Sequence, residues 1–121
     1  MKKYNPSYVK PKDWNEIRDW YSELIHDGLQ LKPMLDLVEH IIKNKFKNRL
    51  FATTSRHTLI LSIYDEIDLQ TEVLKIEFNL STRNWLFDYY GKPFEDAQFS
   101  RQYDENLGIE KFDQFIKFIK W

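Results

Sequence analysis

The chain has 121 residues, of which 42% are hydrophobic and 31% charged, and its net charge is −1. This size and composition suit a single globular domain over residues 1–121. The chain has no cysteine, which excludes disulfides, thiolate zinc sites and cysteine nucleophiles. Its start lacks the apolar run of a secretory signal, and no stretch approaches the roughly 18–20 apolar residues of a membrane span. We therefore expect a soluble cytoplasmic protein with no membrane partner.

The charges are unevenly distributed along the chain. Residues 1–60 hold 11 Lys/Arg and 7 Asp/Glu, whereas residues 61–121 hold 7 and 12. Such asymmetry indicates either a partner surface of opposite sign or attraction between two halves that pack together.

The first predicted helix follows an irregular lead-in over residues 1–12, which contains two prolines and no period. Asp13 can cap this helix, with Glu16 completing a capping box. Gly28 is placed to end it in a left-handed conformation. The apolar face that results consists of Trp14, Ile17, Trp20, Tyr21, Leu24 and Ile25.

Two further helices are predicted, one after Pro33 and one over residues 109–121. Pro33 suits a first helical turn. The second helix has a broad apolar face made by Met34, Leu35, Leu37, Val38, Ile41, Ile42 and Phe46. The apolar face of the last helix is Ile109, Phe112, Phe115, Ile116 and Ile119. Phe118 and Trp121 lie at the edge of that face and could support a homodimer.

Between residues 50 and 90 the apolar pattern changes from the helical period to alternation. This predicts four strands, at residues 50–54, 57–64, 72–80 and 85–90. We expect an α+β fold with two N-terminal helices, a four-stranded antiparallel meander sheet and a C-terminal helix. The helices pack on one face of the sheet, and the alternation predicts that the other face is solvated. The segments 65–71 and 92–108 are expected to be irregular connections.

The hairpin made by the last two strands contains one feature that a fold alone does not explain. If Leu80 pairs with Trp85 across the turn, Glu77 lies opposite Asp88 on the outer face. Like charges directly opposite each other are unfavourable. Three explanations stay open: a function needs the two carboxylates, Lys75 neutralises them, or the true register differs.

No catalytic pattern is present. His26, His40 and His57 have no partner at metal-ligand or catalytic spacing, and three glycines cannot form a phosphate-binding loop. We therefore predict a protein that is not an enzyme and has no catalytic residue, metal ligand or cofactor.

Acidic residues interleaved with aromatic residues are the most informative cluster. Charge steers a basic protein toward such a surface and aromatic side chains anchor it. The predicted partner-binding residues are Tyr64, Asp65, Glu66, Asp68, Glu72, Glu77, Asp88 and Tyr90.

In its general character the chain is similar to bacterial immunity proteins, which sequester a toxin. The similarity lies in small size, an α+β pattern, abundant aromatic residues, an acidic sheet and the lack of cysteine; it includes no alignable stretch. It implies a non-catalytic protein that neutralises a basic toxin, such as a nuclease.

Two other functions remain open. One is a small-molecule pocket between sheet and helices, lined by Trp14, Trp20, Trp85 and Tyr89. The other is nucleic-acid binding, which is less favoured because the chain is slightly acidic and has no nucleic-acid-binding motif. The cations that would contact phosphates are Lys43, Lys45, Lys47, Arg49 and Arg56.

Overall fold

The structure, a computed structural model, describes residues 8–121. The first seven residues of the predicted irregular lead-in lie outside the described part. The helices are α1 (Trp14–His26), α2 (Lys32–Lys43) and α3 (Gly108–Phe118), with short 3₁₀ helices η1 (Phe46–Asn48) and η2 (Glu105–Leu107). The strands are β1 (Tyr8–Val9), β2 (Phe51–Ser55), β3 (Thr58–Ser62), β4 (Ile67–Asp68), β5 (Val73–Phe78), β6 (Asn84–Tyr90) and β7 (Phe99–Asp104).

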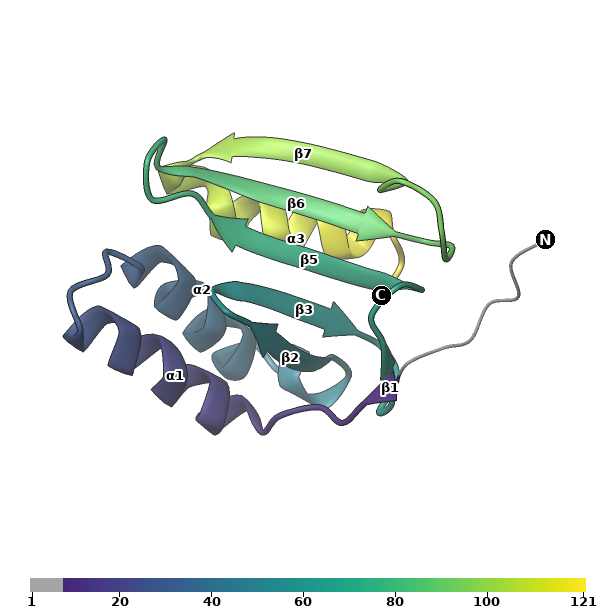
Figure 1. Ribbon diagram of the computed structural model, residues 1–121, viewed down its shortest axis with the longest axis horizontal. Coiled ribbons are helices and arrows are strands. Elements are labelled where there is room, and N and C mark those ends of the chain that lie inside the picture. Colours follow the sequence, from purple (N-terminus) through teal and green to yellow (C-terminus); the bar gives the residue numbers. More distant parts are fainter. Residues whose placement is uncertain (1–7) are drawn as a thin grey trace.

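The main sheet is an antiparallel meander with the strand order β2-β3-β5-β6-β7. The three helices lie on one side of it, with α3 behind β5 to β7 and the α1–α2 pair toward β2 (Figure 1). The predicted α+β class and the placement of helices on one face are therefore confirmed. The largest fully buried side chains between the sheet and the helices are Trp85, Tyr21, Phe87, Phe112 and Ile17.

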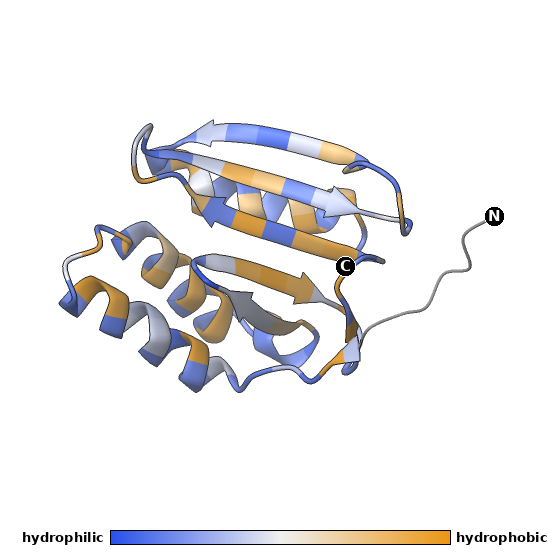
Figure 2. Cartoon of the chain, in the orientation of Figure 1, coloured by the Kyte–Doolittle hydropathy of each residue, from blue (hydrophilic) through white to orange (hydrophobic). Residues whose placement is uncertain are grey.

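The prediction of four strands in the meander was wrong, because β7 lies within the segment expected to be an irregular connection. This strand pairs with β6 over its whole length, from Phe99 opposite Tyr89 to Asp104 opposite Asn84. It forms one edge of the sheet, and four of its six residues are exposed. An edge strand with so little buried surface has no strong alternation of apolar and polar residues. Figure 2 shows this difference between mostly hydrophilic β7 and hydrophobic β3.

The prediction of a wholly solvated outer face was also wrong. Strands β1 and β4, in segments expected to be irregular, pair to form a second antiparallel sheet. A small second core results on the outer side, where Ile60, Ile67 and Val73 are buried. Hydrophobic partners around it are Val9, Phe51, Leu69 and Tyr90. Strands of two residues are too short to show a period, so the sequence could not reveal this cover.

The register of the β5–β6 hairpin differs from the predicted one by two residues. Phe78 lies opposite Trp85, and Lys75, not Glu77, lies opposite Asp88. The side-chain amide oxygen of Asn79 accepts hydrogen bonds from the backbone N–H groups of Ser81 and Thr82, which starts the turn early. Because a shift of two residues keeps every side chain on its face, the predicted buried face is correct for the residues within the strands although the pairs are not. Leu80, which was also predicted on that face, lies in the turn and is exposed.

The ends of the first two helices largely follow the sequence. Asp13 is the N-cap of α1, as predicted, and its carboxylate accepts a hydrogen bond from the backbone N–H of Asn15 at 2.8 Å. Gly28 has φ of +101°, as a left-handed C-terminal stop requires. Pro33 lies in the first turn of α2. Phe46, predicted on the second helix, belongs to η1 because the chain turns at Lys45, where φ is +66°.

Trp85 fixes the position of α3 on the sheet. Its ring packs edge-on against Phe78 and Phe87, and its indole N–H donates to the backbone oxygen of Glu105 at 2.8 Å. The first residue of α3, Gly108, is buried directly against the indole. A Cβ atom at position 108 would overlap that ring.

We predict that Gly108→Ala destabilises the fold by about 1–3 kcal/mol, because the Trp85 ring cannot move without disturbing its neighbours. In a helix without such a contact the same change is stabilising. The control is Gly91→Ala, whose new Cβ would overlap the end of the flexible Gln98 side chain and would lie at an ordinary contact distance from the Tyr89 ring. Urea unfolding followed by circular dichroism measures both. Equal stability of the two variants would contradict the proposed role of this contact.

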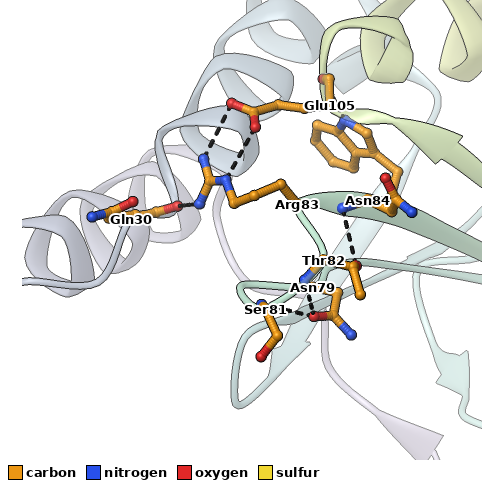
Figure 3. A network of polar contacts seen from close by, with 8 residues as sticks. Gln30, Asn79, Ser81, Thr82, Arg83, Asn84 and Glu105 are labelled. Atoms are coloured by element: carbon orange, nitrogen blue, oxygen red, sulfur yellow. Dashed lines mark hydrogen bonds and ion pairs between the residues drawn. The ribbon is translucent and has the colours of Figure 1, made fainter.

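Arg83 connects three separate segments of the chain (Figure 3). Its Nε and Nη2 donate to the two carboxylate oxygens of Glu105, at 3.0 and 3.2 Å, and its Nη1 donates to the backbone oxygen of Gln30 at 2.7 Å. The guanidinium also lies 4.5 Å above the Phe78 ring centroid. The turn between β5 and β6 is thereby joined to the α1–α2 connection and to η2.

We predict that Arg83→Ala destabilises the fold by about 1–3 kcal/mol, through the lost backbone hydrogen bond and ring contact. Arg18→Ala is the control, since Arg18 forms only a long surface pair with Asp19, at 3.8 Å.

The Arg83 side chain lowers the pKa of Glu105 below its ordinary value of 4.5. The ion pair therefore stabilises the fold above that value and is lost as the pH falls through the lowered pKa. Urea unfolding from pH 7 to pH 3 should show the wild type losing more stability than Arg83→Ala.

Candidate partner-binding surface

Five of the eight predicted partner-binding residues lie together around a hollow at one end of the sheet. The hollow has a volume of about 360 Å³ and is formed mainly by the connection between β3 and β5, which contains β4. We call it the acidic hollow. Its lining consists of Tyr8, Tyr64, Asp65, Glu66, Asp68, Thr71 and Glu72. Among the residues that the structure describes, four carboxylates and no Lys or Arg line it.

Two of the lining residues are aromatic and well exposed. Tyr64 is 50% and Tyr8 58% accessible to solvent. The phenol of Tyr64 donates a hydrogen bond of 2.6 Å to the Glu72 carboxylate. This bond, and the negative charge of Glu72, raise the pKa of Tyr64 above its ordinary value. Glu72 itself has φ of +52°, a conformation that a non-glycine residue adopts at a cost.

Glu77, Asp88 and Tyr90 lie on the outer face of the sheet and not in the acidic hollow. Asp88 lies opposite Lys75, whose ammonium is 4.8 Å from the centroid of the Tyr90 ring. Glu77 lies opposite Leu86, and its carboxylate accepts a hydrogen bond from the Thr58 hydroxyl at 3.2 Å. A cation thus stands between these acids, so the sheet face is of mixed charge and the hollow is the more acidic surface.

Sequence reasoning missed two of the residues that line the acidic hollow, Tyr8 and Thr71. Tyr8 reaches the hollow because β1 pairs with β4, which places it opposite Asp68. No local sequence pattern predicts a contact between two residues that are 60 positions apart. Thr71 follows Asp68 in the predicted acidic segment, and its polar neighbours were the available signal.

The four aromatic residues predicted to line a small-molecule pocket are on different parts of the structure. Trp14 and Trp20 lie on α1 and donate hydrogen bonds to the backbone oxygens of Leu50 and Arg56. Trp85 and Tyr89 lie on β6, where Trp85 is buried in the core. Tyr89 packs on the C-terminal Trp121 ring, 5.8 Å away between centroids.

The basic run predicted for nucleic-acid contact is divided by strand β2. Lys43, Lys45, Lys47 and Arg49 lie at the end of α2 and around η1, before the strand. Arg56 lies in the turn that follows it. Five extended residues span roughly 17 Å, so the run is one cluster of four cations and a separate fifth.

The three histidines do not form a catalytic or metal-binding cluster. In the part of the chain that the structure describes, only His40 has a carboxylate partner, Asp113, at 2.7 Å. Among residues 8–121, no group of three His, Asp or Glu side chains converges as metal ligands do. None of the helices in this part of the chain has the length and apolar character to cross a bilayer.

Comparison of the chain with protein-family models, with curated proteins and with solved structures gives no significant match. The function must therefore be argued from the residues of this chain.

We predict that Glu72→Gln lowers the pKa of Tyr64 toward its ordinary value of 10.0, because the charged acceptor of the phenol is removed. Glu66→Gln is the matched control, since it removes a carboxylate from the same hollow but no hydrogen bond to Tyr64. Carbon NMR of labelled tyrosine, titrated with pH and assigned with Tyr64→Phe, measures the pKa. An equal shift in both variants would mean that the hydrogen bond has no special effect.

Proposed function

We propose that this chain is a non-catalytic protein-binding module, and specifically a bacterial immunity protein that neutralises a basic toxin such as a nuclease. The observation that carries the proposal is the acidic hollow, of about 360 Å³, in which four carboxylates and two exposed tyrosines meet and to which residues 8–121 contribute no Lys or Arg.

The charge of the hollow supports a basic partner. Carboxylates that stand close together repel one another, which reduces the stability of the fold. A Lys or Arg side chain entering the hollow would remove that repulsion and gain charge-assisted hydrogen bonds. Complementary charge would also speed the encounter with the partner.

The exposed tyrosines support a protein partner over a free ion. Tyrosine is enriched at interface centres because it brings a large, rigid surface together with a polar end. Tyr64 is already held by Glu72, so little side-chain entropy is lost when it contacts a partner.

The outer face of β5 and β6 extends this proposed surface. Tyr90 lies opposite Val73, the residue after Glu72, so it stands at the same end of the sheet as the hollow. Asp88 and Glu77 follow along the face, with Lys75 between them. We assign the main binding energy to the hollow and a peripheral role to these two acids.

The other functions considered have weaker support. The aromatic residues of the predicted small-molecule pocket are on separate elements, and the basic run is split by β2. Neither the aromatic residues nor the cations are therefore gathered in one place, as a binding site would require.

The experiment is a paired capture from a lysate of the organism that encodes the chain. The wild type and Asp65→Lys/Glu66→Lys serve as baits, and retained proteins are quantified by mass spectrometry. We expect a basic protein that the wild type retains in stoichiometric amount. The charge reversal should weaken its affinity by more than about tenfold.

The control is Asp19→Lys/Glu23→Lys, which makes the same change in net charge on the exposed side of α1. Loss of the partner with both double variants would show attraction to overall charge and contradict the assigned site. Retention by all three baits would contradict it as well. A third variant, Glu77→Lys/Asp88→Lys, measures how far the interface extends over the sheet.

A further inference from the structure

A second hollow, of about 290 Å³, lies where α2 ends, beside η1 and α3. It shares no lining residue with the acidic hollow. We call it the α2–α3 hollow. Its lining consists of His40, Asn44, Phe46, Arg49, Asp113 and Lys117.

Hydrogen bonds connect the side chains of Asn44, His40 and Asp113 along one wall of this hollow. The amide nitrogen of Asn44 lies 2.9 Å from the backbone oxygen of His40 and 3.0 Å from its Nδ1. An amide nitrogen has two hydrogens, so it can donate to both atoms. Nδ1 of His40 then accepts a hydrogen bond, which leaves the ring hydrogen on Nε2. The Nε2–H group of His40 donates to Oδ1 of Asp113 at 2.7 Å. The ring is further held between Phe46 and Phe112.

The two cations of the hollow are not neutralised by neighbours. The Arg49 guanidinium lies 4.6 Å above the Phe46 ring, which restricts its position. Within the part of the chain described, neither Arg49 nor Lys117 forms an ion pair, and Asp113 is paired with His40. With a neutral His40, the lining carries two positive charges and one negative charge.

This arrangement combines an anion-binding side with a hydrogen-bond acceptor. Arginine and lysine together suit a phosphoryl group, with arginine donating in its fixed fork and lysine as a point charge. Oδ2 of Asp113 has no hydrogen-bond partner among residues 8–121, so it can accept from a hydroxyl group. Asp113 would repel a bare anion that came close to it.

We propose that the α2–α3 hollow binds a small phosphate monoester that carries a hydroxyl group, such as a sugar phosphate. The phosphoryl group contacts Arg49 and Lys117, and the hydroxyl donates to Asp113. The volume of the hollow exceeds what phosphate alone needs. This site is independent of the proposed partner surface, because no residue is common to the two.

The probes are inorganic phosphate, ribose 5-phosphate and ribose, titrated at constant ionic strength of about 0.15 M, where distant charges are screened. Proton–nitrogen NMR of the histidine rings reports binding at a defined place, because His40 lines the hollow and His26 and His57 do not. We expect saturable shifts of His40 with ribose 5-phosphate, at a dissociation constant of about 1 mM or below. Phosphate should bind more weakly and ribose should cause no shift.

Charge-matched variants separate a built site from diffuse attraction. Lys117→Gln should weaken ribose 5-phosphate binding by about tenfold or more, the effect of one hydrogen bond to a charged group. Lys47→Gln, an exposed cation outside the lining, should change it less than about twofold. Asp113→Asn keeps an acceptor for His40 and should tighten binding of inorganic phosphate, because a like charge is removed.

Three results would overturn the proposal. The first is the absence of a saturable His40 shift with any phosphate probe. The second is an equal effect of Lys47→Gln and Lys117→Gln, which would mean attraction to the general basic surface. The third is equal affinity for phosphate and ribose 5-phosphate, which would remove the role of the hydroxyl group.

Discussion

The burial of Trp85 against Gly108 is the contact on which the arrangement of sheet and helices depends. The indole packs on Phe78 and Phe87 and donates to the backbone of Glu105, so it joins the central hairpin to the start of α3. Only a residue without a Cβ fits beneath the ring. Arg83 binds the side chain of the same Glu105 and reaches the α1–α2 connection. The contact of Trp85 with Gly108 and the ion pair of Arg83 with Glu105 therefore hold the elements together at one end of the domain. The position of α3 also determines where Asp113 and Lys117 stand, and so it shapes the α2–α3 hollow.

The outer face of the sheet is divided by its small second core. Strands β1 and β4 cover Ile60 and Val73 at one end, which removes that part of the face from solvent. On the remaining part, Lys75 stands opposite Asp88, as cross-strand pairing of opposite charges favours. The short strands also bring Tyr8 beside the acidic connection. As a consequence the strongest concentration of negative charge is at the end of the sheet, in the acidic hollow, and not along the open face. The proposed partner surface follows from this displacement.

Within residues 8–121, most ion pairs do not join the basic first half of the chain to the acidic second half. Of the ion pairs found in residues 8–121, Lys32–Asp36 and Arg83–Glu105 each lie within one half, as does Arg18–Asp19. His40–Asp113 alone joins the two halves, and it carries full charge only when the histidine is protonated. Arg49 and Lys117, the cations of the α2–α3 hollow, form no ion pair within the part of the chain that the structure describes.

The sequence by itself determined the class of fold, the three helices and which face of the long strands turns toward the helices. These follow from periods of 3.6 and 2 over many residues and from local signals such as Asp13, Gly28 and Pro33. It also identified the acidic segment, since its four acidic residues lie within eight positions of the chain, from Asp65 to Glu72. Tertiary structure alone decided the pairing of β1 with β4, the edge strand β7 and the two-residue shift of the hairpin register. Short strands have no measurable period, and a register shift of two leaves the pattern of faces unchanged. The meeting of His40 with Asp113, 73 residues apart, depended likewise on the packing of α2 against α3, which no local pattern encodes.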